Sequence, residues 1–162
     1  MTNAHDFSFA KLNEPGAINL ADFAGKAVLV VNVASACGLT PQYRDLEALY
    51  EAKAAKGLVV LGVPCNDFGA QEAAAEKDIR EFCDANYHVS FPMTGKVEIT
   101  SQARRHPFYQ WIANELGDGA LPRWNFHKYL IGKDGALAES FSSKAAPLEP
   151  SLLEAIDKAL TA

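Results

Sequence analysis

Two stretches of this chain are almost entirely apolar and rich in β-branched residues. Ala27 to Val33 reads AVLVVNV, and residues 58–63 read LVVLGV. Runs this short and this apolar are typical of strands buried on both faces, as at the centre of an α/β sheet. Between them an apolar stripe at helical spacing starts at Tyr43, and Gly57 ends the helix. Two central strands joined through a helix are expected to be parallel, with a right-handed crossover.

The remaining elements are predicted from turn residues and apolar periodicity. A small hairpin is expected over residues 7–20 around Pro15-Gly16, and a second one around Asp134-Gly135. Helices are expected over residues 76–87, 107–116 and 150–160, with one more strand between the first two of these helices. This order resembles an α/β thioredoxin-like fold, with an N-terminal β-hairpin and a central mixed sheet flanked by helices.

Length and composition fit one ordinary globular unit. The 162 residues are 49% hydrophobic and 22% charged, and no repeat or Pro/Gly/Ser-rich linker divides them. We therefore expect a single domain over residues 1–162. The net charge of -5 disfavours a nucleic-acid partner, because such partners select basic faces. No window reaches the roughly 18 apolar residues of a membrane helix, and the N-terminus lacks a signal-peptide pattern, so we expect a cytoplasmic protein without stable membrane insertion.

Cys37 lies between the end of the first buried strand and the start of a helix, in the stretch NVASACGLTPQY. Thr40 is the expected N-cap of that helix and Pro41 its first residue. A helix N-terminus carries partial positive charge, which favours the reactive thiolate. Thr40 also stands where a C-x-x-C motif would have its second cysteine, so disulfide exchange through such a pair is excluded. Position alone leaves Cys37 open as a reactive or a structural cysteine.

Two further segments carry hydrogen-bond donors, and the first of them leaves the same edge of the predicted sheet as Cys37. PCNDFGAQE, residues 64–72, follows the second strand and contains Gln71. RWNFHKYLI, residues 123–131, carries Trp124 and Asn125 just before a predicted strand. Amide and indole N–H groups stabilise an anionic sulfur, whereas hydrolysis needs a proton acceptor beside the nucleophile. The pattern therefore favours thiolate chemistry. Taken alone, however, residues 64–72 could be an ordinary polar loop, and Trp124 could be a tryptophan of the hydrophobic core.

Taken together, the three segments resemble the glutathione peroxidase family in order and approximate spacing. The resemblance implies that Cys37, Gln71, Trp124 and Asn125 form the catalytic tetrad of a peroxidase. It further implies reduction of hydrogen peroxide and of organic or lipid hydroperoxides, with no cofactor and no metal. The sequence departs from the family pattern at three places, which are Asp67 in place of Gln, Ala73-Ala74 in place of Pro-Gly and His88 in place of Gly.

The resemblance also bears on the second half of the reaction. Cys83 lies in a segment similar to the resolving-cysteine region of thioredoxin-dependent family members, whereas Cys65 is expected to be structural. On helical spacing alone Cys83 belongs to an apolar stripe and would be buried. A Cys37–Cys83 disulfide therefore requires the helix around Cys83 to open, and thioredoxin rather than glutathione is the expected reductant. The short link from Glu115 to Arg123 lacks the insertion of tetrameric members, which favours a monomer.

The sequence leaves three alternatives open. A cysteine hydrolase would need a base, and His127 is the only histidine inside the three segments. A redox sensor would use the same cysteines and pass its disulfide to a client protein. A metal site is disfavoured because the three cysteines, 28 and 18 residues apart, lack the paired spacing of zinc ligands.

Overall fold

A mixed four-stranded sheet in the order β4-β3-β5-β6 forms the centre of the computed structural model, which describes residues 3–162. β3 (Ala27–Val33) and β4 (Leu58–Pro64) are parallel, as predicted for the two apolar runs. β5 (Lys128–Ile131) pairs antiparallel with β3, and β6 (Leu137–Phe141) pairs antiparallel with β5. The predicted N-terminal hairpin is also present as a separate antiparallel pair, β1 (Ser8–Ala10) and β2 (Ala17–Asn19).

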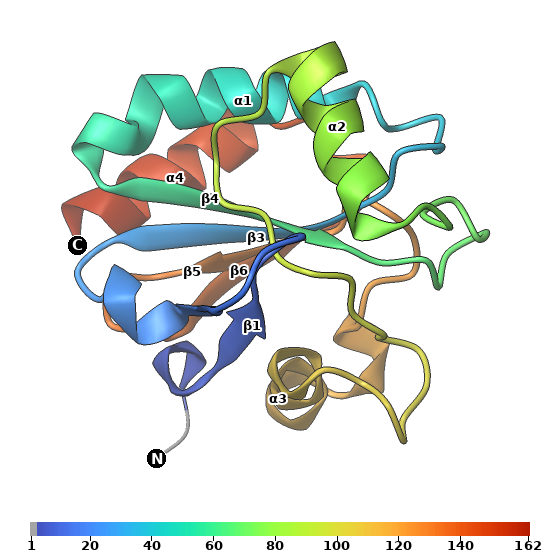
Figure 1. Cartoon of the computed structure of the whole chain (residues 1–162). Helices are drawn as coiled ribbons and strands as arrows, with labels where there is room; N and C mark the ends of the chain where they lie inside the picture. The colour runs from blue at the N-terminus through green and yellow to red at the C-terminus, as the bar shows by residue number, and fades with distance from the viewer. Residues whose placement is uncertain (1–2) are drawn as a thin grey trace.

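Helices cover both faces of this sheet (Figure 1). One face carries α1 (Gln42–Lys53), α2 (Glu76–Tyr87) and α4 (Pro150–Thr161). α3 (Pro107–Leu116) lies on the other face, on the same side as β1. Short 3-10 turns complete the chain: η1 (Ala4–Asp6), η2 (Leu20–Phe23), η3 (Ala54–Lys56) and η4 (Asp118–Ala120). No helix within residues 3–162 is long and apolar enough to cross a membrane.

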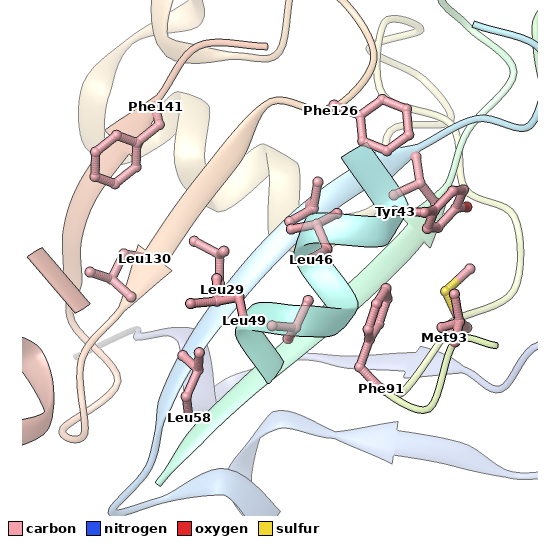
Figure 2. Packing of buried hydrophobic residues seen from close by; sticks show 14 of the residues in the cluster. Leu29, Tyr43, Leu46, Leu49, Leu58, Phe91, Met93, Phe126, Leu130 and Phe141 are labelled. Atoms are coloured by element: carbon pink, nitrogen blue, oxygen red, sulfur yellow. The ribbon is translucent and has the colours of Figure 1, made fainter. Parts of the chain in front are cut away.

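Successive residues of β3 feed two separate hydrophobic cores. Leu29 and Val31 belong to the core under α1, α2 and α4, while Val28 and Val30 belong to the core that includes α3. Figure 2 shows the first core, in which the leucines of α1 gather beside Leu29 of β3. Because helices bury both faces, β3 and β4 are apolar along nearly their whole length instead of alternating with polar residues.

The strand expected between α2 and α3 is absent from the described part of the chain. Between these helices, Met93 and Val97 form only isolated parallel bridges, to Gly62 and Cys65 of the β4 edge. Pro92 lacks an N–H group and therefore interrupts regular pairing in this segment. The segment still runs along β4, which explains how a strand at the edge of the sheet is buried over its full length.

The predicted start of α1 is wrong by one residue. The helix begins at Gln42, and Pro41 rather than Thr40 occupies the N-cap position, without a side-chain capping bond. The Thr40 hydroxyl is engaged elsewhere: it accepts a hydrogen bond from the Cys37 N–H (2.9 Å) and donates to the Ala34 carbonyl (2.7 Å). A residue that locks the preceding loop cannot also cap the helix with the same oxygen atom.

Candidate active site

The Cys37 sulfur lies in a tight loop between β3 and α1. Its thiol is free and the residue is 8% exposed, so a small oxidant can approach it. The Leu39 N–H points at the sulfur at 3.3 Å, which favours the anionic form. The Thr40 N–H donates to the Cys37 carbonyl at 3.0 Å, and the Thr40 hydroxyl holds the Cys37 N–H. Thr40 thus closes the loop at the position where a C-x-x-C protein has its second cysteine.

Gln71 and Glu72 join the second predicted segment to the Cys37 loop. The Ala36 N–H donates to the Gln71 carbonyl at 3.0 Å, and the Ser35 N–H donates to the Glu72 carboxylate at 3.1 Å. Glu72 is buried, and this burial raises the pKa of its carboxyl group. These two contacts fix the segment after β4 beside the residues that immediately precede Cys37.

Asn125 organises Gln71 rather than donating to the sulfur. The Asn125 amide nitrogen donates to the Gln71 side-chain oxygen at 3.0 Å and to the Phe68 carbonyl at 3.2 Å. Both of its protons are therefore used, which differs from the expectation that Asn125 contributes direct donors to the thiolate. Since the Gln71 oxygen is occupied by Asn125, the Gln71 NH₂ group is the end that is left to face an anion.

Trp124 is held in place at both its backbone and its ring. Its carbonyl accepts a hydrogen bond from the Asn32 side chain at 3.0 Å. Its ring packs edge-on against Phe68, with 6.4 Å between centroids. Gly69 lies against the same ring: a Cβ atom there would be 2.7 Å from the Trp124 ring. The close approach requires glycine, which also adopts the left-handed φ of +72° at this position.

We predict that Gly69→Ala slows oxidation of Cys37 by hydrogen peroxide about 10- to 100-fold. The added methyl group displaces the Trp124 ring and disturbs Gln71, whose side chain lies 3.4 Å from the same Cβ position. Stopped-flow tryptophan fluorescence without reductant measures this step.

Gly25→Ala is the matched control for this substitution. Gly25 also has a left-handed φ, of +85°, but its Cβ position has no neighbouring atom within 4 Å. It therefore carries the same backbone strain without touching the site. Equal oxidation rates in the two variants would show that strain, and not the contact with Trp124, accounts for any loss.

Asp67, one of the departures from the family pattern, anchors the loop that holds Gln71. Its carboxylate accepts hydrogen bonds from the N–H groups of Ile99 (2.6 Å) and Thr100 (2.9 Å). Partial burial alone would raise the pKa of this carboxyl group, but the two backbone hydrogen bonds hold it below its ordinary value. The ionised Asp67 therefore ties the loop to the segment before α3 instead of adding charge at the sulfur.

The other two cysteines lie in different cores. Cys83, on α2, shares the core that contains Cys37, whereas Cys65 belongs to the core on the opposite face of the sheet. Both are fully buried. Burial raises the pKa of the Cys65 thiol to about 12 and that of the Cys83 thiol to about 11, although the Tyr43 hydroxyl works in the opposite direction at Cys83. Of the two, only Cys83 is on the same side of the sheet as Cys37.

His127 does not supply a base for Cys37. Its ring packs on Tyr129, with 4.7 Å between centroids, and its Nε2 atom lies 2.8 Å from the Ser140 hydroxyl. Tyr129 belongs to the core around α3, while Phe126 lies in the core with Cys37. His127 therefore faces the other side of the sheet and cannot act as the base that the hydrolase alternative needs.

Two residues that support the site, Asn32 and Gly69, were not singled out by sequence patterns, and a third, Thr40, was expected to cap the helix instead. Asn32 holds Trp124, Gly69 admits its ring, and Thr40 locks the Cys37 loop. Asn32 could have been found from the sequence, since it is the only polar residue in the apolar run AVLVVNV. A buried asparagine inside a strand needs a hydrogen-bond partner from another segment, which here is Trp124.

Comparisons with known proteins agree with this geometry. Residues 4–113 match the family model described as Glutathione peroxidase. The chain is 44% identical over 150 residues to the glutathione peroxidase of Lactococcus lactis subsp. cremoris, covering 91% of this chain and 94% of that protein. It is 47% identical over 137 residues to the hydroperoxy fatty acid reductase Gpx2 of Synechocystis sp., covering 85% and 86% of the two chains.

Solved structures support the same assignment. The crystal structure of Trgpx in apo form superposes with a TM-score of 0.77 at 34% identity, covering 99% of this chain and 97% of that one. A thiol:disulfide interchange protein of the thioredoxin family from Chlorobium tepidum reaches a TM-score of 0.72 at 16% identity over 98% and 96% of the chains, which confirms the thioredoxin-like fold. This chain belongs to the glutathione peroxidase family, and it is a peroxidase that works through a thiol.

Proposed function

We propose that this chain reduces hydrogen peroxide and organic or lipid hydroperoxides through Cys37. The Cys37 thiolate attacks the O–O bond, so the sulfur becomes a sulfenic acid and the other oxygen leaves as water or an alcohol after taking up a proton. The observation that carries the proposal is a Cys37 sulfur that receives the Leu39 N–H at 3.3 Å on a residue that is 8% exposed, while His127 binds Ser140 instead of Cys37. Gln71, Trp124 and Asn125 complete the catalytic set in this proposal.

Cys83 is the proposed resolving residue. Its thiol condenses with the Cys37 sulfenic acid, which forms the S–S bond and releases water. Three observations support it over Cys65: it shares a core with Cys37, it lies on a helix, and that helix has no side-chain cap at its N-terminus and a strained, non-glycine left-handed residue at its C-cap. The N-cap of α2 is Ala75, which makes no side-chain bond, and the C-cap is His88 in the left-handed conformation. Such a helix end opens at low cost.

We expect His88→Gly to stabilise the protein by about 1 kcal/mol and to slow disulfide formation by about fivefold. His88 has a φ of +50°, and its N–H donates to the Cys83 carbonyl, so glycine relieves strain directly at the end of the helix that carries Cys83. Urea denaturation measures the first effect, and a rapid-quench thiol assay after peroxide addition measures the second.

Asn13→Gly provides the comparison for His88→Gly. Asn13 has a similar φ of +53° and lies in the N-terminal hairpin turn, where its backbone N–H donates to Glu76 of α2, a bond that the substitution keeps. It should stabilise the protein without changing disulfide formation. If His88→Gly stabilises the protein and leaves disulfide formation at the wild-type rate, opening of this end of α2 does not limit the reaction.

Thioredoxin is the proposed reductant, because an internal disulfide is resolved by thiol exchange through a mixed disulfide. One observation favours glutathione as the competing electron donor. Arg44 and Lys144 line a surface groove together with Gly38, Leu39 and Asp45, so the fold adds Lys144, distant in sequence, to the basic Arg44 near the Cys37 loop. Steady-state peroxide reduction with thioredoxin and its reductase, compared with glutathione and its reductase, decides between the donors. Faster turnover with glutathione would overturn the thioredoxin assignment.

We place the chain in the cytoplasm as a monomeric single domain over residues 1–162. The net charge of -5 supports a role without nucleic acid. Gel filtration coupled to light scattering tests the monomer.

A further inference from the structure

Lys128, the first residue of β5, is completely buried. Its side chain is 0% exposed, although lysine is almost never fully buried unless it is paired. The three ion pairs found within residues 3–162 join other residues, and none includes Lys128. An ammonium group in the interior without a carboxylate partner calls for another explanation.

Its ammonium group binds oxygen atoms from three separate segments. The Nζ atom donates to the Phe126 carbonyl and to the Gln42 side-chain oxygen, both at 2.7 Å. It also lies 3.5 Å from the Ser143 carbonyl. The Gln42 amide nitrogen donates to the same Ser143 carbonyl at 2.8 Å, which fixes the Gln42 oxygen toward the lysine. Lys128 is thus the point where the start of α1, the segment before β5 and the segment after β6 meet.

Two of these three segments carry the candidate active site. Gln42 is the first residue of α1, directly after the loop of Cys37. Phe126 follows Asn125, and it adopts a left-handed φ of +66°, which is unfavourable for a residue with a side chain. The Phe126 N–H donates to the Asn32 carbonyl at 2.6 Å, so this turn is held by β3 on one side and by Lys128 on the other.

Removing the Lys128 ammonium group from water costs free energy, and an apolar side chain of similar size would fill the same space without that cost. Burial lowers the pKa of the Lys128 ammonium to about 7, although Glu149 works in the opposite direction. Replacing a buried charged group by an apolar one of similar size is often neutral or stabilising. An apolar side chain has no donors, however, whereas the ammonium has three and can bind the Phe126 and Gln42 oxygens at once.

We propose that Lys128 is a positioning residue for peroxide reduction, which holds the Trp124–Phe126 turn against the first turn of α1. This inference rests on the proposed function of Cys37. Through Phe126, the lysine fixes the neighbouring Asn125, whose amide nitrogen orients Gln71. Lys128 itself touches neither the peroxide nor the sulfur in this role. Its effect on the reaction is transmitted through Asn125.

Lys128→Met tests the proposal, with Lys56→Met as the matched control. Lys56 is an exposed lysine in η3, outside the site. Oxidation of Cys37 by hydrogen peroxide is followed by stopped flow without reductant. Lys128→Met should lower the second-order rate constant about 10- to 100-fold, because misplacement of a site by about 1 Å has effects of this size. Lys56→Met should leave it unchanged, and thermal melting gives the folded fraction of each variant.

A double-mutant cycle separates positioning from a general structural role. In an Asn125→Ala background, Lys128→Met should change the oxidation rate by no more than about twofold, because the residue through which it acts is already gone. The positioning role is overturned if the loss is equally large in both backgrounds, or if Lys128→Met oxidises at the wild-type rate. If Lys128→Met does not fold, the same cycle is run with Gln42→Met, and an unchanged oxidation rate in that variant also overturns the proposal.

The outcome is distinguishable from a failure of the proposed function. If wild-type Cys37 is not oxidised by peroxide, the proposed function itself is wrong. If wild-type Cys37 is oxidised and the lysine variant matches it, only the role of Lys128 is wrong.

Discussion

Replacing Cys37 with serine is expected to lower peroxide turnover by on the order of a thousandfold or more. The reaction needs a thiolate, and the Leu39 N–H at 3.3 Å favours the anionic sulfur. A serine hydroxyl stays protonated at neutral pH and is not oxidised by peroxide. The measurement is consumption of hydrogen peroxide and of an organic hydroperoxide with thioredoxin and its reductase.

Cys65→Ala is the control for the loss of a cysteine. Cys65 is fully buried in the core on the other face of the sheet, and its thiol has a pKa of about 12. Its loss should lower the melting temperature and leave turnover per folded molecule unchanged. If Cys37→Ser retained turnover within about tenfold of the wild type, another group would carry the reaction.

Cys83→Ser is expected to lower thioredoxin-supported turnover by on the order of a hundredfold, while the first oxidation of Cys37 keeps its rate. Without the Cys83 thiol no internal disulfide forms, and the sulfenic acid persists because thioredoxin then lacks its disulfide substrate. Steady-state assays measure the loss. Stopped flow without reductant measures the first oxidation, and a dimedone adduct at Cys37 identifies the trapped sulfenic acid.

The same experiment tests whether α2 opens. Cys83 is fully buried and its thiol has a pKa of about 11, so it reacts slowly in the closed helix. A disulfide needs the two Cα atoms within about 7 Å, so we expect amide exchange along α2 to increase in the oxidised protein. Peptide mapping of peroxide-treated wild type should yield a Cys37–Cys83 link. The resolving role is excluded if that link is absent, or if Cys83→Ser turns over at the wild-type rate.

Most of the fold follows from local patterns. α2 and α3 have the predicted limits, and β3 covers the run from Ala27 to Val33. These elements were predictable because apolar periodicity, turn residues and helix-stopping glycines act over a few residues. The structure of the segment between α2 and α3 could not be predicted in this way. Isolated bridges to β4 replace a strand there, and these bridges form only because the segment runs along the edge of β4.

The residues of the candidate site could be predicted from the sequence, but the contacts between them could not. Cys37, Gln71 and Trp124 come from segments that the sequence already marked, and the contacts of Ala36, Phe68 and Gly69 bring those segments together. The amide of Asn125, by contrast, holds Gln71 and Phe68 rather than facing the sulfur. The direction in which an amide points depends on its neighbours across space, and sequence spacing does not contain those neighbours.

The sequence by itself determined the buried strands, the helices and a cysteine at the end of a strand, because each depends on backbone sterics and side-chain periodicity over a few residues. The tertiary structure decided three further points. It placed Cys83 on the same face of the sheet as Cys37 and Cys65 on the opposite face. It turned His127 away from the site, and it buried the Lys128 side chain against the Phe126 carbonyl. These depend on contacts between segments far apart in the chain, which form only when the sheet and its two helical layers pack together.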